Sequence, residues 1–339
     1  MCNKDISNPK AIILDIFVLA KYEIVLVGAL KFFSEYKYSK NVLNLQRKII
    51  AVFCCVGIIC MIINQLKGIP TMNFPEQRYG LKSFQFIAGH PGDLGVICNY
   101  LIIFLVLDLY NNPNKKKIDK ILIILDLILM LSTLRTRAIC NAILFSLLYY
   151  CFYYKRNSKK NIKIILFITV ILISFVSIDQ FQNYFVDNER TPRSDFLKGG
   201  IKLMQENSPI GVGLGNYGSF AAKKYYSQIY YRFGFNNNYG MSEDDGMFLT
   251  DNFWPMIMGE FGYIGIILYT NLLIGTFHLL KHFSISWKNK FIIYYIFIVM
   301  LLNSTASSSF VHYSAVSYMF ILSYFIFNEG REKKENGKR

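Results

Sequence analysis

Long and nearly uninterrupted apolar blocks constrain the fold of this chain more than any other feature. Most of them approach the roughly 20 residues that an α-helix needs to cross a bilayer. The 339 residues are 53% hydrophobic and only 17% charged, whereas a soluble domain carries more charge and amphipathic rather than solid apolar runs. We therefore expect an all-α polytopic membrane protein with about nine transmembrane helices. The predicted spans are residues 11–33, 48–66, 84–109, 121–133, 138–154, 162–178, 252–275, 291–302 and 311–328.

The first of these spans is the weakest, because it contains three charged side chains. Asp15, Lys21 and Glu23 lie inside it, and each such charge costs about 2.5–3.5 kcal/mol on membrane-insertion scales. We therefore expect this span to need partner helices. The residues before it lack the apolar core of a signal peptide.

Basic residues in short loops predict the orientation. The net charge of +15 could indicate nucleic acid, but most lysines lie between the apolar blocks, which is the positive-inside pattern. We therefore exclude a nucleic-acid partner and expect the N-terminus outside and the C-terminus in the cytoplasm. Three parts follow: N-terminal helices (1–178), an extracytoplasmic loop (179–250), and C-terminal helices with a basic tail (251–339). Residues 67–83, 134–137 and 303–310 also face outward, while 34–48, 115–120, 155–163, 281–290 and 331–339 face the cytoplasm.

Arginines do not follow the lysines. Many of them fall on the predicted outer side, where the positive-inside rule does not place them. A guanidinium group offers a planar fork that holds phosphate oxygens through two N–H groups. A shared anion site therefore competes with simple anchoring to lipid headgroups. The outer arginines are Arg78, Arg135, Arg137, Arg190, Arg193 and Arg232.

The loop contains a segment that predicts a helix beside the membrane, residues 191–206. Thr191 can cap it and Pro192 suits its first position. Arg193 would lie in the first turn, where backbone N–H groups also favour an anion. An ordinary interfacial helix explains the pattern equally well. Its expected apolar face is Phe196, Leu197, Ile201 and Met204.

Three further features of the loop leave alternatives open. Gly211, Gly213 and Gly215 alternate, which indicates a tight turn or a close approach rather than a dinucleotide fingerprint. The aromatic run 223–239 suits either sugar rings or the membrane interface. The acids after it could supply a general base, hold a divalent cation, or simply be solvated. These acids are Glu243, Asp244, Asp245 and Asp251.

Taken together, four stretches resemble the O-antigen ligase and O-antigen polymerase family of bacterial membrane glycosyltransferases. Their order and their predicted side of the membrane match the family. Members usually have further spans before the equivalent of 11–33, so we expect a form with a short N-terminus or a start further upstream. The stretches are RYGLKSFQFIAGHPGDLG (78–95), LSTLRTRA (131–138), the element from Arg193 through SPIGVGLGNY, and TDNFWPMIMGEFGYIG (250–265).

The resemblance implies a GT-C type of fold in the bacterial cytoplasmic membrane and an inverting transfer that uses neither a metal nor a cofactor. The implied donor and acceptor are undecaprenyl-diphosphate-linked oligosaccharides, which the protein would bind within the membrane, among membrane lipids. The implied protein partners are a chain-length regulator and a flippase of the same pathway. Asp251-Asn252 stands where the ligase branch has His-Asn, which favours a polymerase; ligation to another acceptor and transport of lipid-linked sugars are the alternatives.

Physical chemistry assigns candidate roles within that reaction. Arginines can stabilise the charge of a leaving diphosphate, and a base must take the proton of the acceptor hydroxyl. The base candidates are Asp251, Glu243 and His90, although His90 could instead cap the end of a span. The candidates for binding the diphosphate are Arg78, Arg135, Arg137, Arg190 and Arg193.

Overall fold

The computed structural model describes most of the chain, and that part is mainly helical, as predicted. Its contacts divide the chain into two compact units, residues 1–32 with 173–339, and residues 33–172. This division follows packing, whereas the predicted parts (1–178, 179–250, 251–339) follow the expected sides of a membrane. The described residues are 8–36, 40–68, 72–78, 80–111, 116–153, 167–168, 171, 174, 191–283, 287–305 and 307–336.

The second unit is a helical bundle with one small antiparallel hairpin, which the sequence did not predict. In this bundle α4 packs against α2, α3 and α5. The predicted block 84–109 becomes helical only at Pro91, because Phe84 still pairs with Asn73 in the hairpin and proline suits the first helical turn. The elements are α2 (Lys40–Lys67), β1 (Asn73–Arg78), β2 (Leu81–Phe84), α3 (Pro91–Asn111), α4 (Lys116–Ser132) and α5 (Thr136–Tyr153).

Polar contacts fix both ends of this bundle. At one end Arg47 of α2 forms a buried ion pair with Asp119 of α4, with Nε and Oδ1 2.8 Å apart. At the other end, the side chain of Gln65 exchanges two hydrogen bonds with the backbone of Lys82 in β2. Ser83 then donates to the carbonyl oxygen of Thr133 in the turn between α4 and α5. The hairpin is thus tied to two helices.

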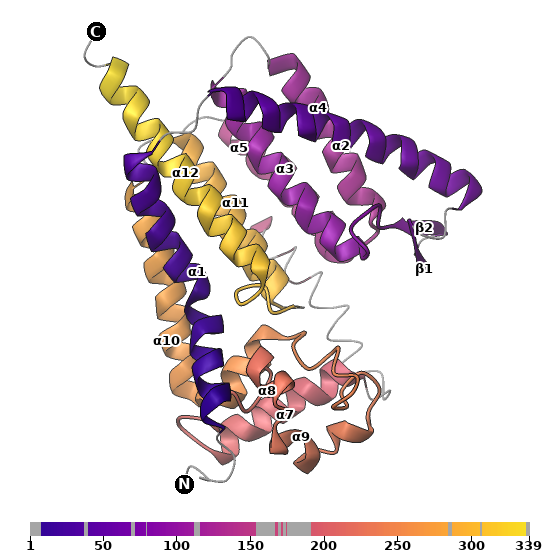
Figure 1. Ribbon diagram of the computed structural model, residues 1–339, viewed down its shortest axis with the longest axis vertical. Coiled ribbons are helices and arrows are strands. Elements are labelled where there is room, and N and C mark those ends of the chain that lie inside the picture. The colour runs from indigo at the N-terminus through magenta and orange to yellow at the C-terminus, as the bar shows by residue number, and fades with distance from the viewer. Residues whose placement is uncertain are drawn as a thin grey trace. The chain divides into compact units, whose positions relative to one another are not determined.

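The first unit places four long helices side by side, with shorter helices gathered at one end (Figure 1). The long helices are α1 (Pro9–Glu35), α10 (Phe253–Phe283), α11 (Trp287–Ser304) and α12 (Tyr313–Asn336). The shorter ones are α7 (Pro192–Glu206), α8 (Phe220–Lys224), α9 (Gln228–Arg232) and the 3-10 turn η3 (Phe235–Asn237). They lie near the beginnings of α1 and α10 (Figure 1).

Among the described residues, two helices are long and apolar enough to cross a membrane, Asn41–Lys67 and Phe253–His282. Three shorter apolar helices are Pro91–Val106, Lys290–Ser304 and Tyr313–Phe327. Most of the predicted span 162–178 lies outside the described residues. A membrane association is therefore indicated, while the number of spans stays a prediction.

The start of α7 confirms the predicted cap. Thr191 accepts a hydrogen bond from the backbone N–H of Ser194, and Pro192 is the first helical residue. The predicted apolar face is only partly correct, since Leu197 and Ile201 are half-buried. Two glycines lie on the buried face instead, at positions where Tyr217 and Pro255 come too close for a side chain. The buried residues are Ser194, Phe196, Gly199, Gly200, Leu203 and Met204.

Candidate functional site

The described part of the predicted extracytoplasmic loop, residues 191–250, folds around an aromatic core. Tyr217 stacks on Phe196 of α7 with ring centroids 4.5 Å apart, and its hydroxyl donates to the carbonyl oxygen of Phe196. The run 223–239 contributes Tyr226, Tyr230 and Phe235 to this core. Neither interpretation of this run, binding of sugar rings or contact with the membrane interface, predicts that its side chains form a core. Tyr225, Tyr231 and Tyr239 of the same run remain exposed.

Helix α10 is broken where this folded part meets it. Gly262 has φ 61° and ψ −152°, which interrupts the helix. The segment 208–219, here called the glycine loop, fills the break: Val212 and Gly213 donate N–H groups to the carbonyl oxygens of Gly259 and Glu260. The carbonyl oxygen of Pro209 in turn accepts from Ile264. The loop therefore satisfies backbone groups that the break would leave without partners.

The three predicted glycines each take a left-handed backbone conformation, with φ between 69° and 91°. At Gly211 a side chain would collide with the backbone of α10, since a Cβ would lie 2.5 Å from the carbonyl oxygen of Gly259. At Gly215 it would lie 2.9 Å from Ala11 of α1. Gly213 has space around it and needs glycine for its φ alone. Both a tight turn and a close approach therefore occur in the glycine loop.

Arg193 and Asp251 meet at the edge of this assembly. Arg193 of α7 donates from Nη2 and Nε to the same oxygen of Asp251, at 2.7 and 3.2 Å. Asp251 lies two residues before α10, and α7 packs closely against α10 where Gly200 touches Pro255. The two side chains are 35% and 31% exposed, so solutes can reach the pair. A predicted anion-binding residue and a predicted base are thus in direct contact.

The remaining acids of the loop do not join this pair. Glu243 is exposed and accepts a hydrogen bond from the hydroxyl of Tyr231 at 2.8 Å. Within the part of the chain that the structure describes, no three histidine, cysteine, aspartate or glutamate side chains form a group suited to a metal ion. The divalent-cation interpretation of the acidic run therefore gains no geometric support from these residues.

The other predicted site residues belong to the second unit, except Arg190, which lies outside the described residues. His90 caps α3: its Nδ1 accepts from the N–H of Gly92 at 3.0 Å. Arg135 precedes α5 in the predicted turn between two helices, and Arg137 lies in the first turn of α5. Arg78 ends β1, paired with Leu81. Whether these groups converge with Arg193 stays a prediction.

One polar centre, formed around Glu260 of α10, is absent from the predicted site. One oxygen of this buried carboxyl accepts from the backbone N–H groups of Asn216 and Tyr217 and from the hydroxyl of Ser219. Asp15 of α1 accepts from the neighbouring Gly215 at 2.8 Å. The sequence indicates that the span containing Asp15 needs partner helices, whereas Glu260, which also lies inside an apolar block, is not among the predicted site residues. A charged residue inside an apolar block is the sequence signal that could have identified Glu260.

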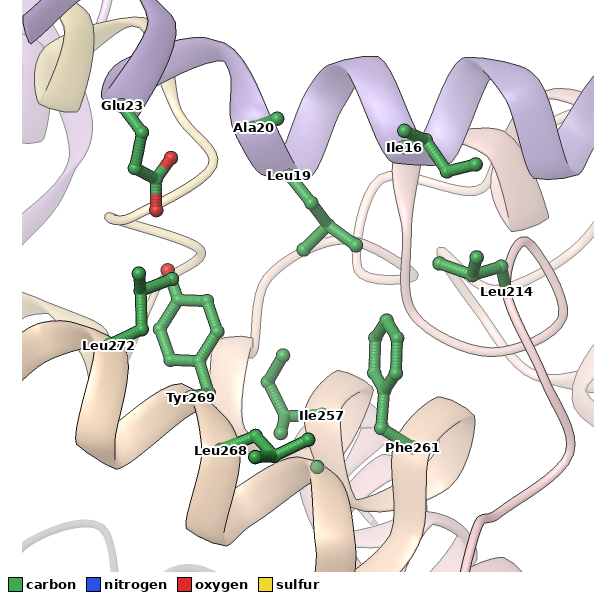
Figure 2. A pocket seen from close by; sticks show the side chains of 11 residues that line it. Ile16, Leu19, Ala20, Glu23, Leu214, Ile257, Phe261, Leu268, Tyr269 and Leu272 are labelled. Carbon is green, nitrogen blue, oxygen red and sulfur yellow. The ribbon is translucent and has the colours of Figure 1, made fainter. Parts of the chain in front are cut away.

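A cavity of about 500 Å³ lies between α1, α10 and the glycine loop. Figure 2 shows Leu214 and Phe261 toward one end and Glu23, Tyr269 and Leu272 toward the other. Its walls are almost entirely aliphatic or aromatic. Cavities of roughly 300–1,000 Å³ are typical of small-molecule sites. This one suits a hydrocarbon chain.

No protein-family model matches the chain, and a search of characterised proteins finds no significant match. The resemblance to a family therefore rests on the chain's own residues.

Proposed function

We propose that this protein is a polysaccharide polymerase of the bacterial cytoplasmic membrane, with an active site on the outer face. It would transfer a glycan from undecaprenyl diphosphate onto a lipid-linked repeat unit. The observation that carries the proposal is the accessible contact between Arg193 and Asp251, which come from two of the four stretches that resemble the family. The hydrogen bonds between the glycine loop and α10 join the same two stretches and support it further.

The pair suits the proposed chemistry. In the reaction an acceptor hydroxyl forms a bond to the anomeric carbon as the bond to the diphosphate breaks. The leaving diphosphate keeps the bonding electrons, and a guanidinium group can stabilise that charge. The hydroxyl's proton must go to a base. We propose that the diphosphate takes Arg193 away from Asp251, and that the released carboxylate of Asp251 accepts the proton.

The environment of the pair supports a membrane-bound, lipid-linked substrate. The cavity beside α10 reaches Ile257, which follows Asp251 by less than two helical turns. It could hold the first isoprene units of the carrier while the diphosphate contacts Arg193. In addition, large apolar side chains are exposed along α1 and α10, as expected of helices that face lipid. They include Ile13, Phe17, Ile24, Ile267 and Leu268.

A transporter of lipid-linked sugars is the second candidate, because buried acids favour it. Asp126 of α4 is fully buried, within hydrogen-bonding reach of the Cys98 side chain. Acids inside membrane helices often mark transport pathways. A transporter would not need the Arg193–Asp251 contact, so the same variants separate the two functions.

The test is to incubate the purified full-length protein with lipid-linked repeat units and no nucleotide sugar. A ladder of longer glycans supports a polymerase, and a single product on a different acceptor would instead indicate a ligase. No product, together with movement of the lipid-linked units across vesicle membranes, would indicate a transporter. Arg193→Lys should abolish the ladder, because a lysine lacks the planar fork. Arg232→Lys is the matched control, since Arg232 is exposed and pairs with Glu206.

A further inference from the structure

Two buried carboxyl groups from different helices meet beneath the glycine loop. Asp15 of α1 and Glu260 of α10 are both fully buried. They accept hydrogen bonds from the backbone N–H groups of consecutive residues, Gly215 and Asn216. The two carboxyl groups also lie within hydrogen-bonding reach of each other. They therefore form one polar centre rather than two separate ones.

Within the described part of the chain, two of the four carboxyl oxygens in this centre lack a hydrogen-bond donor. Oε1 of Glu260 has three donors and Oδ2 of Asp15 has one. The other two oxygens, Oε2 of Glu260 and Oδ1 of Asp15, are buried with no hydrogen-bond partner among the described residues. No basic side chain of the described residues contacts either carboxyl. Each of these two oxygens therefore needs a donor.

One proton satisfies both oxygens. Two adjacent carboxylates without a cation repel each other, and burial makes that repulsion costly. A proton on one oxygen creates an O–H group that donates to the other and leaves a single negative charge. The four loop donors then stabilise that charge, since hydrogen bonds to a charged acceptor are the strong ones.

We propose that Asp15 and Glu260 share one proton, and that this acid pair positions the glycine loop and, through it, Arg193 and Asp251. The shared proton follows from the contacts alone, whereas the link to Arg193 and Asp251 as reacting groups rests on the proposed function. Neither acid touches substrate in this proposal, so both are positioning residues.

A continuous set of contacts leads from the acid pair to the reactive pair. Glu260 accepts from the N–H of Tyr217, and the hydroxyl of Tyr217 donates to Phe196 of α7. Phe196 lies one helical turn after Arg193. On the other side, Glu260 belongs to α10, the helix that begins two residues after Asp251. Removing the carboxyl of Glu260 would leave three buried donors without an acceptor and loosen this connection.

Amide substitutions test the shared proton. In Glu260→Gln the amide oxygen can keep the three loop donors while its NH₂ group donates to Asp15, as the proton did. Asp15→Asn can do the same in reverse. We therefore expect each single amide variant to keep its thermal unfolding midpoint and its ladder close to those of the wild type. The double variant Asp15→Asn/Glu260→Gln brings the NH₂ groups of two amides against each other. It should therefore unfold at a lower temperature and make no ladder.

Further variants test whether the polar groups of Glu260 matter, and they separate the acid pair from the proposed function. Glu260→Ala should lower the unfolding midpoint and lose the ladder, and recovery of both in Glu260→Gln is the decisive comparison. Glu206→Gln is the control on an exposed acid. Infrared spectra supply a readout that does not depend on activity: the band of a protonated carboxyl present in the wild type should disappear from each single amide variant.

The outcomes are distinct. Loss of stability in either single amide variant would overturn the shared proton, and so would a double variant as stable as the wild type. An acid pair that behaves as expected in unfolding and infrared spectra, in a protein that makes no ladder, would overturn the proposed function and the link to the reactive pair. Glu260→Ala that keeps a full ladder would overturn the positioning role alone.

Discussion

Arg193 directs two of its N–H groups at a single carboxylate oxygen of Asp251, and this contact joins α7 to the residues that lead into α10. Because the pair is partly exposed, an incoming diphosphate can compete with the carboxylate for the guanidinium group. Substitutions of Asp251 and of Arg193 should therefore have opposite effects on the affinity for a diphosphate.

Asp251→Asn should strengthen the binding of undecaprenyl diphosphate while it abolishes glycan transfer. The amide removes the competing charge from Arg193, and partly exposed ion pairs are worth up to about 1 kcal/mol, so a two- to fivefold gain in affinity is expected. Arg193→Lys should weaken the binding instead. Binding to the purified protein measures both changes. Weaker binding by Asp251→Asn would contradict the exchange of partners.

The glycine loop should respond unequally to alanine. Gly213→Ala adds only the cost of a left-handed backbone, about 1–2 kcal/mol. Gly211→Ala adds a collision with the backbone of α10, where a Cβ would lie 2.7 Å from the N of Gly262, so it should cost clearly more. Gly275→Ala in α10 is the control, because nothing lies near its Cβ position. Thermal unfolding ranks the three, and equal effects at Gly211 and Gly213 would argue against the contact.

Local signals in the sequence predicted much of the helical framework. Thr191 followed by Pro192 located the start of α7, because capping depends only on neighbouring residues. The buried face of α7 was predicted less well. Gly199 and Gly200 have no side chain to mark a face, and their burial results from Tyr217 and Pro255, which are distant in the chain.

The polar centre of the site could be predicted only in part. Asp15 was recognised as a costly charge in an apolar block, but which group offsets that cost depends on how α1 packs against α10. The aromatic run raised a similar difficulty. Tyr230 is buried because the loop builds its own core around Phe196, and composition alone does not distinguish such a core from an interface belt.

The buried ion pair between Arg47 and Asp119 predicts a large effect in the second unit. Arg47→Met would remove the guanidinium group that pairs with the buried carboxylate of Asp119, at a cost of about 3–5 kcal/mol. Replacing both residues, as Arg47→Met/Asp119→Leu, should recover most of that loss, since a buried ion pair is seldom worth more than a well-packed apolar pair. Denaturant unfolding in detergent measures both variants. A double variant no better than Arg47→Met would contradict this account.

The aromatic core of the loop predicts a loss of stability at alkaline pH. Burial raises the pKa of Tyr226 to about 12, and it also raises the pKa values of Tyr217 and Tyr230. In the unfolded chain these hydroxyls ionise near pH 10. Above that pH the folded protein holds protons that the unfolded chain has released. Stability should therefore be complete below about pH 10 and fall as the pH rises toward about 12.

Tyr226→Phe separates the two contributions of this hydroxyl. At neutral pH the variant loses the hydrogen bond to the carbonyl oxygen of Met241 and should be less stable by about 1 kcal/mol. Between pH 10 and 12 its stability should fall less steeply than that of the wild type, because one ionising group of the core is gone. Unfolding midpoints measured across this range test both statements. Tyr239→Phe, at an exposed position, is the control, and a decline equally steep in Tyr226→Phe would place the alkaline sensitivity outside this side chain.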